Sequence, residues 1–557
     1  MQGFFGFSPH LAASIMTDIA KKQRVELYDT TLRDGTQGLG IALTVVDKIN
    51  IARLLDDLGF DYIEGGYPLS NPKDVAFFEE ARKLEWKHAK VCAFGMTRRK
   101  GIKPEEDQGM QALVSAGAPI ITIVGKTWDL HVDEVLRIDR DENLAMIEDS
   151  VRFCSDQPQV EQVFYDAEHF FDGYKANPAY TLQTIDSAVK GGATRLVLCD
   201  TNGGSLPSEI TEIVSAVQKH VGTGGPALAI HVHNDGGLAV ANSLAAVQAG
   251  CIQVQGTING IGERCGNVDL ITMAANLSLK YGKDVLRSGA VGRLTELSRF
   301  VYEATGTTPV PNQPYVSDGA FAHKGGMHVH AVQRIAHSYE HVPPESIGNQ
   351  RHILVSELSG ASNIAADLGE KFGISDNKDV QRAVLNKVQD LENEGYQFED
   401  AKASYELLVY EALGKRPAMW DLDHYRCMIS RHDKQQATTE ATVKLMVNGV
   451  VEHHVGEGDG PVAALDYALR ACLRSHYPEI ADLHLVDFKV RVVNPSAETA
   501  ARVRVTITFA LGLDNPDRET RLFTTVGVDE NVVDASWEAI ADAIQYHLIE
   551  SKATVSA

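Results

Sequence analysis

The sequence has few cysteines, and they follow no pattern. Seven cysteines among 557 residues are an odd number, lie scattered along the chain and include no Cys-x-x-Cys pair. This distribution argues against a disulfide scaffold and against a structural zinc knuckle. We therefore expect reduced thiols in a cytoplasmic protein.

Positive charge and long apolar runs are also lacking. The 52 lysines and arginines are outnumbered by 75 aspartates and glutamates, which gives a net charge of −23 with neutral histidines. Nucleic-acid binding and adsorption to an anionic membrane both need a positive field, so neither is expected. No apolar run approaches the roughly 18 to 20 residues that span a bilayer. Residues 1–24 lack a clear signal-peptide pattern and are expected to form an N-terminal extension.

What the chain does contain is a regular alternation of strand and helix patterns. With 44% hydrophobic and 23% charged residues it has a globular composition, and its length requires at least two domains. Short apolar runs, each followed by a segment of helical period, are expected as strands at 25–32, 61–67, 90–95, 120–124, 162–167, 194–199, 228–232 and 251–257. Eight such units predict a (β/α)8 TIM barrel over residues 25–285. A doubly wound open sheet is the alternative, but its glycine-rich fingerprint after the first strand is missing.

Polar residues at the ends of these strands indicate a metal site. His231 and His233 are two residues apart on one strand, so their imidazoles share a face. Asp34 and Asn267 follow the strands that ring closure brings alongside. Two nitrogen and two oxygen ligands suit a divalent cation, with Mn, Mg, Zn or Co all acceptable. The alternative is a pair of core histidines without a metal.

Three more polar residues are expected at the same rim of the barrel. The planar guanidinium of Arg33 is suited to hold a carboxylate or an enolate oxygen, and the alternative is a buried structural ion pair with Glu64 or Glu168. Glu168 is a candidate acid or base. Thr201 is a candidate donor to a substrate carboxylate, with an ordinary turn at the strand end as the alternative.

The motifs that contain these residues resemble one enzyme family. D-T-T-L-R-D-G-T-Q at 29–37, H-V-H-N-D at 231–235 and N-G-I-G-E-R-C-G-N-V at 259–268 are similar to the three signatures of the α-isopropylmalate, homocitrate and citramalate synthases. Within this group, the stretches at 166–175, 321–329 and 354–360 look most like the longer citramalate synthases. The order Gly326-Met327-His328-Val329-His330 departs from the pattern that isopropylmalate synthases more often show.

The resemblance implies a Claisen-type condensation of acetyl-CoA with a small 2-keto acid, pyruvate in the citramalate case, followed by thioester hydrolysis on a route to isoleucine. It implies that Arg33 stabilises the oxyanion and that His328, together with Glu168, belongs to the proton-transfer relay. Tyr339 matches a tyrosine near the active site of the family. His328 and Tyr339 are expected to be supplied by a partner subunit, as in the family.

Other functions remain open at this point. The first is isopropylmalate synthesis from 2-ketoisovalerate at the same site, because a branched pocket contributes only about 1 to 3 kcal/mol of discrimination. Functions of another class are a carbon–carbon lyase or decarboxylase and a catalytically silent amino-acid sensor. A silent sensor would not need the arginine and the four metal ligands together.

The remaining chain is expected to cover and regulate the barrel. Residues 286–429 are interrupted by prolines and are expected to be linker subdomains over the barrel mouth. Six His and Lys side chains at 323–341 also raise the alternative of a second metal site.

Residues 430–557 contain an internal repeat, because 453–473 and 524–544 align at an offset of 71. We expect an α+β domain there, which by resemblance binds an amino-acid effector such as isoleucine and forms a homodimer. The glycines at 456, 458 and 460 indicate either an anion-binding loop or a plain turn.

Overall fold

The computed structural model describes residues 23–354, 364, 368–369, 371–431, 437–494, 501–512 and 520–555. The chain divides into two compact units, Met1–Phe321 with Val342–Gln350 and Ala322–His341 with Arg351–Ala557. Almost all of the expected N-terminal extension lies outside the described residues. So does the motif at 354–360, apart from its first residue.

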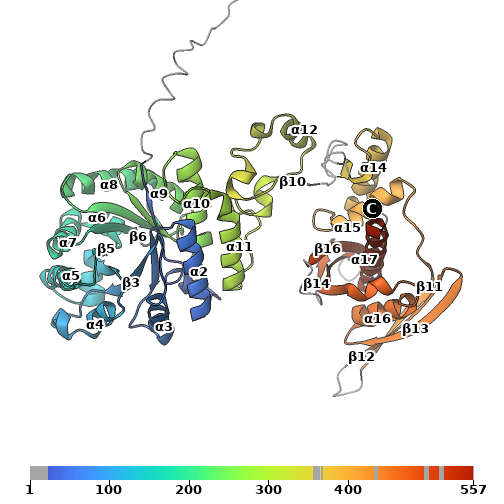
Figure 1. Cartoon of the computed structure of the whole chain (residues 1–557), viewed down its shortest axis with the longest axis horizontal. Helices are drawn as coiled ribbons and strands as arrows, with labels where there is room; N and C mark the ends of the chain where they lie inside the picture. Colours follow the sequence, from blue (N-terminus) through green and yellow to red (C-terminus); the bar gives the residue numbers. More distant parts are fainter. Residues whose placement is uncertain are drawn as a thin grey trace, which may run out of the picture. The chain divides into compact units, whose positions relative to one another are not determined.

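The first unit contains a closed barrel of eight parallel strands, in blue to green in Figure 1. The strands are β1 (Glu26–Asp29), β2 (Tyr62–Gly66), β3 (Lys90–Met96), β4 (Ile120–Lys126), β5 (Gln162–Glu168), β6 (Arg195–Asp200), β7 (Ala227–Val232) and β8 (Gln253–Gly256). β1 pairs with both β2 and β8, which closes the ring. The predicted TIM barrel is confirmed, and an open doubly wound sheet is excluded.

Helices follow the strands around the outside of the barrel. They are α2 (Val45–Leu58), α3 (Pro72–Ala81), α4 (Gln108–Ser115), α5 (Arg140–Ser155), α6 (Phe170–Ala176), α7 (Pro178–Gly191), α8 (Pro207–Val221), α9 (Ala239–Gln248) and α10 (Leu270–Ala275). Only α6 was not expected, because its seven residues are too few to show a helical period. α2 illustrates the local signals: Thr44 and Asp47 cap each other's backbone at its start, and Gly59 ends it in the left-handed conformation.

The inside of the barrel is filled with side chains and forms no open pore. Inward-facing residues from seven of the eight strands make one buried cluster, namely Tyr28, Tyr62, Cys92, Ile120, Phe164, Val197, Cys199 and Ala229. A larger apolar core lies between the strands and the surrounding helices. Functional groups are therefore left to the carboxyl ends of the strands, as in other TIM barrels.

Part of the expected linker packs on the barrel. In α11 (Leu294–Thr305), Leu294, Leu297 and Val301 are fully buried and join the barrel core. These positions lie on one helix face, which explains why residues up to Phe321 belong to the first unit. The expected boundary at 286 therefore precedes a segment that is integral to the barrel unit.

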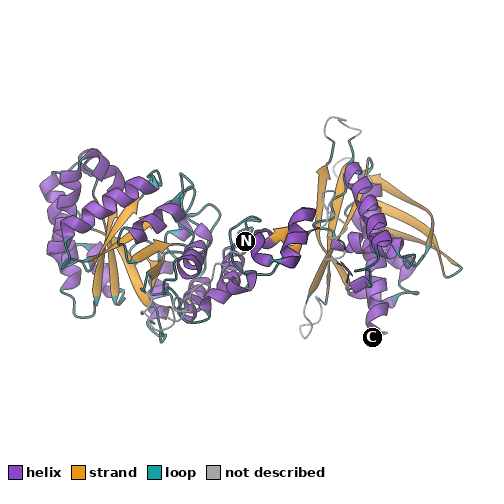
Figure 2. Cartoon of the chain, turned by 90° about the horizontal axis from the view of Figure 1, so that it is seen from above, coloured by secondary structure: helices purple, strands orange, loops and turns teal. Residues whose placement is uncertain are grey.

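The second unit begins with α12 (Gly326–Arg334), α14 (Lys378–Glu394) and α15 (Lys402–Ala412) and continues into two similar halves. The first half contains the antiparallel strands β11 (Asp421–Ser430), β12 (Thr438–Val447) and β13 (Val450–Gly458), followed by α16 (Pro461–Leu473). The second half contains β14 (Leu483–Val492), β15 (Val503–Leu511) and β16 (Arg521–Asp529), followed by α17 (Val532–Val555). Figure 2 shows these sheets in orange beside their helices. β11 starts ahead of the expected boundary at 430.

The glycines of the repeat are explained by helix packing. Gly456 and Gly527 occupy equivalent positions in the two halves, and a Cβ atom on them would lie 2.5 Å and 2.1 Å from backbone carbonyl oxygens of α16 and α17. A side chain at either position would push the helix off its sheet. Gly456 therefore serves close packing of α16. No helix in the described part of the chain is long and apolar enough to cross a membrane.

Candidate active site

Three of the four predicted metal ligands meet at the carboxyl ends of β1 and β7. His231 Nε2 lies 3.3 Å from His233 Nε2 and 3.4 Å from Asp34 Oδ2, and His233 Nε2 lies 3.7 Å from the same oxygen. All three residues are buried. Burial raises the pKa of Asp34, but the neighbouring Arg33 and His231 outweigh it and hold that pKa well below its usual range. Asp34 is therefore an anion throughout the physiological pH range.

Asn267 is the fourth predicted ligand, and its backbone forms an antiparallel bridge with His233, which makes it a direct neighbour of the cluster. Both its buried Oδ1 atom and the buried Nδ1 atom of His233 are without a hydrogen-bond partner. An unpaired carbonyl oxygen buried beside a carboxylate and two imidazoles fits a site for a divalent cation. Burial and the adjacent His231 lower the pKa of His233 to about 4, which keeps it in the neutral form that binds metals.

A second layer of residues orients His231. Its Nδ1 atom lies 3.1 Å from Gln255 Oε1, and the amide nitrogen of Gln255 donates to Asp166 Oδ1 at 3.3 Å. Such outer partners fix the ring orientation of a metal ligand. Burial, together with the negative charge of Glu64, raises the pKa of Asp166 to about 7.

Arg33 reaches the mouth of the barrel in an ion pair with Glu64. Its Nε atom donates to Glu64 Oε2 at 2.7 Å, and its guanidinium lies 3.8 Å from the centre of the Phe94 ring. The Glu64 carboxylate is fully buried and also accepts hydrogen bonds from Tyr28 and Thr30. The expected ion pair is thus present, with Glu64 as the partner. A second guanidinium nitrogen, Nη1, lies 3.5 Å from Asp34 Oδ1, and Arg33 lines the cavity that contains Asp34.

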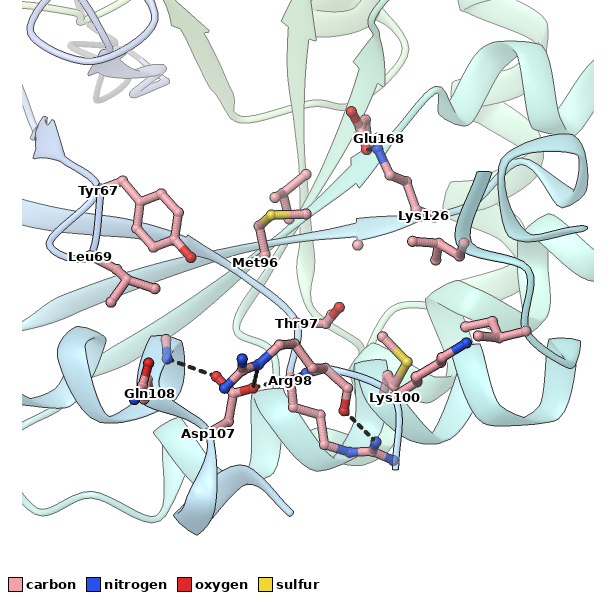
Figure 3. A pocket seen from close by; sticks show the side chains of 17 residues that line it. Tyr67, Leu69, Met96, Thr97, Arg98, Lys100, Asp107, Gln108, Lys126 and Glu168 are labelled. Carbon is pink, nitrogen blue, oxygen red and sulfur yellow. Dashed lines mark hydrogen bonds and ion pairs between the residues drawn. The ribbon is translucent and has the colours of Figure 1, made fainter. Parts of the chain in front are cut away.

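Glu168 ends β5 and pairs with the ammonium group of Lys126 at the end of β4. Its backbone carbonyl accepts a hydrogen bond from the Thr127 hydroxyl at 2.6 Å. The two charged groups point toward each other in Figure 3. Glu168 is therefore a half-buried carboxylate held beside a cation, at the rim where the sequence predicts an acid or base.

Thr201 follows β6 at the same rim. Its hydroxyl oxygen accepts a hydrogen bond from the backbone N–H of His169 at 2.8 Å. Its backbone carbonyl accepts one from Arg264, which also pairs with Asp235. The turn after β6 is thereby tied to the loops that follow β5, β7 and β8.

His328 and Tyr339 belong to the second unit, whereas the other predicted site residues belong to the first. Their rings stack with centroids 4.2 Å apart. Nearby, Glu340 accepts hydrogen bonds from Arg351 and lies 3.1 Å from His323 Nε2. Among the described residues, Asp34, His231 and His233 form the one cluster that suits a metal, so nothing supports a second metal site at 323–341.

Two cavities open at the mouth of the barrel. One, of about 310 Å³, is lined by all the predicted site residues of the barrel except Asn267, which are Arg33, Asp34, Glu168, Thr201, His231 and His233. The other, of about 460 Å³, is mostly apolar and is shown in Figure 3. Both have Tyr67, Met96, Val124, Lys126 and Glu168 in their walls. A ligand in the larger cavity would therefore reach Glu168.

The sequence analysis missed Lys126, Asp166 and Gln255. Two of them have a signal in the sequence: Lys126 ends an apolar strand with a charge, and Gln255 stands in β8 where an apolar residue is usual. Their roles depend on pairing across neighbouring strands, which no local pattern reveals.

Family models match the whole described architecture. Residues 24–301 match the HMGL-like model, residues 315–396 match the homocitrate synthase post-HMGL domain-like model, and residues 399–548 match the LeuA allosteric (dimerisation) domain. The HMGL-like match covers the barrel and the cluster of Asp34, His231 and His233. The LeuA match covers the two repeated halves of the second unit.

Curated relatives match over nearly the full length. The chain is 48% identical to the (R)-citramalate synthase of Geobacter sulfurreducens over 95% of this chain and 98% of that protein. It is 49% identical to the (R)-citramalate synthase of Aquifex aeolicus over 95% and 99% of the two chains. A probable 2-isopropylmalate synthase of Methanopyrus kandleri is more distant, with 32% identity over 94% and 98%. The chain therefore belongs to the (R)-citramalate synthase family of enzymes.

Proposed function

We propose that this protein condenses acetyl-CoA with pyruvate and hydrolyses the product thioester, releasing (R)-citramalate and CoA. The observation that carries this proposal is the convergence of Arg33, Asp34, Thr201, His231 and His233 on one cavity. Five (R)-citramalate synthases that are 44–49% identical to this chain support the choice of pyruvate over 2-ketoisovalerate.

Asp34, His231, His233 and Asn267 would hold a divalent cation, with Mn, Mg, Zn and Co all compatible with two imidazoles and two oxygens. When bound, the cation acts as a Lewis acid that polarises the carbonyl of the keto acid. The protein contributes a buried, preformed anionic pocket. Gln255 keeps the ring of His231 oriented toward it.

The remaining groups of the mouth would bind and activate the two substrates. Arg33 is a cation next to the metal cluster, suited to stabilise the negative charge that develops on the carbonyl oxygen during carbon–carbon bond formation. Thr201 would donate a hydrogen bond to the substrate carboxylate. Glu168 would take part in removing the methyl proton of the acetyl group, with His328 and Tyr339 as further members of the relay.

The larger cavity is suited to the pantetheine arm of the thioester. Its walls are mostly apolar, which suits the methylene and methyl groups of this arm, while Arg99 and Lys100 supply positive charge for the phosphates of a nucleotide. Its shared wall at Lys126 and Glu168 would bring the acetyl group to the carboxylate (Figure 3).

The second unit would regulate the enzyme and join two copies of it. The match to an allosteric (dimerisation) domain supports a homodimer with an effector site. Isoleucine, the amino acid to which citramalate leads, would be that effector. Large apolar side chains on its sheets are more than half exposed, namely Met428, Ile429, Val451, Val455 and Leu522. Apolar groups in such number favour burial against another chain. The seven free thiols are in keeping with a cytoplasmic enzyme.

A thiol-release assay tests the proposal. With acetyl-CoA, pyruvate and Mn²⁺, we expect the enzyme to release one CoA for each (R)-citramalate that it forms. Chiral chromatography and mass spectrometry measure the (R)-citramalate. Prior dialysis against EDTA should abolish the release, and added metal should restore it. Full activity after EDTA dialysis would contradict the metal assignment, and the absence of citramalate would contradict the reaction.

A further inference from the structure

The turn between β5 and α6 contains a histidine in an unusual backbone conformation. His169 follows Glu168 with φ of 57° and ψ of 33°, the left-handed region that residues other than glycine rarely adopt. Its ring is 9% exposed and packs against His131, with centroids 4.3 Å apart, and against Trp128 at 5.7 Å. The packed ring explains how this strained turn is maintained.

The strained turn directs one hydrogen bond. The backbone N–H of His169 donates to Thr201 Oγ1 at 2.8 Å. The ring Nδ1 of His169 lies 3.3 Å from Asp172 Oδ2, which also accepts from the side chain of Asn202, next to Thr201. The turns after β5 and β6 are therefore joined at Thr201 and at the next residue, Asn202.

The hydrogen bond from His169 leaves the hydroxyl group of Thr201 able to act as a hydrogen-bond donor. A hydroxyl group whose oxygen accepts a hydrogen bond still has one hydrogen to donate. No described residue accepts a hydrogen bond from Thr201 Oγ1, and Thr201 lines the cavity that contains the metal cluster. The hydroxyl hydrogen is thus available for donation at a residue in the wall of that cavity.

We propose that His169 is a positioning residue that fixes the Thr201 hydroxyl as a hydrogen-bond donor to the carboxylate of the keto-acid substrate. It acts through its backbone N–H, while its buried ring anchors the left-handed turn that presents this group. The inference rests on the proposed function, because it needs a keto acid in the cavity of Asp34 and His231. It concerns binding of the keto acid and leaves binding of the thioester unaffected.

Steady-state kinetics of His169→Gly test this role. Glycine adopts the left-handed conformation readily but removes the ring that anchors it. We expect the KM for pyruvate to rise about tenfold while the KM for acetyl-CoA changes less than twofold. His169→Asn should restore most of the affinity, because asparagine tolerates this conformation and its amide can bond Asp172. Asn448→Gly is the matched control: Asn448 has φ of 50° in the β12–β13 hairpin, and its replacement should change neither constant.

A double-mutant cycle with Thr201→Val separates positioning from general stability. If His169 acts through the hydroxyl, His169→Gly should add little to the KM for pyruvate once the hydroxyl is removed. Independent, multiplicative effects of the two substitutions would overturn the proposal, and so would an unchanged KM in His169→Gly. Failure of the wild-type enzyme to use any 2-keto acid would instead overturn the proposed function.

Discussion

Replacing Glu64 with glutamine tests whether Arg33 is held in place for catalysis. Glutamine has nearly the same size as glutamate, but it is uncharged and offers one acceptor oxygen where the carboxylate offers two. The native carboxylate accepts from Tyr28, Thr30 and Arg33 and is fully buried. The substitution therefore leaves at least one buried donor without its acceptor and removes the charge that faces the guanidinium.

The size of the effect follows from these contacts. A hydrogen bond to a charged group contributes about 1.5 to 3 kcal/mol, and breaking a buried ion pair costs about 3 to 5 kcal/mol. Because the amide keeps one acceptor, we expect a loss of stability of about 2 kcal/mol, or roughly 3 to 4 °C in the melting temperature of a barrel unit of this size. If the misplaced Arg33 loses one charged hydrogen bond to the transition state, kcat/KM falls about 10- to 150-fold.

Thiol release under saturating metal gives kcat/KM, and thermal unfolding followed by circular dichroism gives the melting temperature. Glu161→Gln is the control, because Glu161 pairs with Lys90 through side chains that are about half exposed. Breaking such a pair changes stability by at most about 1 kcal/mol. Wild-type values of both kcat/KM and melting temperature in Glu64→Gln would refute the role of Glu64 in positioning Arg33.

Three further predictions concern the metal, the pH dependence and the regulatory unit. His233→Ala should lose its divalent cation on dialysis, as measured by elemental analysis. His220→Ala is the control, because it changes an exposed histidine ring, and it should keep the cation. Equal metal content in the two variants would contradict the ligand assignment. Burial raises the pKa of Asp29 to about 7, so between about pH 4 and 7 the native state holds a proton that the unfolded state has released, and stability falls as pH rises through this window. The melting temperature of Asp29→Asn minus that of the wild type should therefore increase with pH up to about pH 7 and then stay constant. A difference that does not change with pH would show that Asp29 is charged when folded. Gly527→Ala places a methyl group 2.1 Å from a carbonyl oxygen of α17, so it should reduce inhibition by isoleucine and leave turnover without isoleucine intact. Gly460→Ala is the control, because its methyl group meets open space and should change neither property. Undiminished inhibition in Gly527→Ala would place the effector elsewhere.

The barrel and the histidine pair of the candidate metal site were predictable because they depend on local periods. Alternating apolar runs and helical segments located all eight strands, and the spacing of His231 and His233 placed both rings on one face. The ion pair of Lys126 with Glu168 was not predictable, because it requires the order of strands in the ring and the depth of each side chain. The packing of residues 294–305 on the barrel was missed for a similar reason. Prolines nearby suggested a linker, whereas one buried face of this helix joins it to the barrel core.

The most direct test of the central claim is the ratio of kcat/KM for pyruvate to that for 2-ketoisovalerate, measured by thiol release with acetyl-CoA and the same bound metal. Membership in the (R)-citramalate synthase family predicts a clear preference for pyruvate. A higher kcat/KM with 2-ketoisovalerate would contradict the account and identify the site as one for isopropylmalate synthesis.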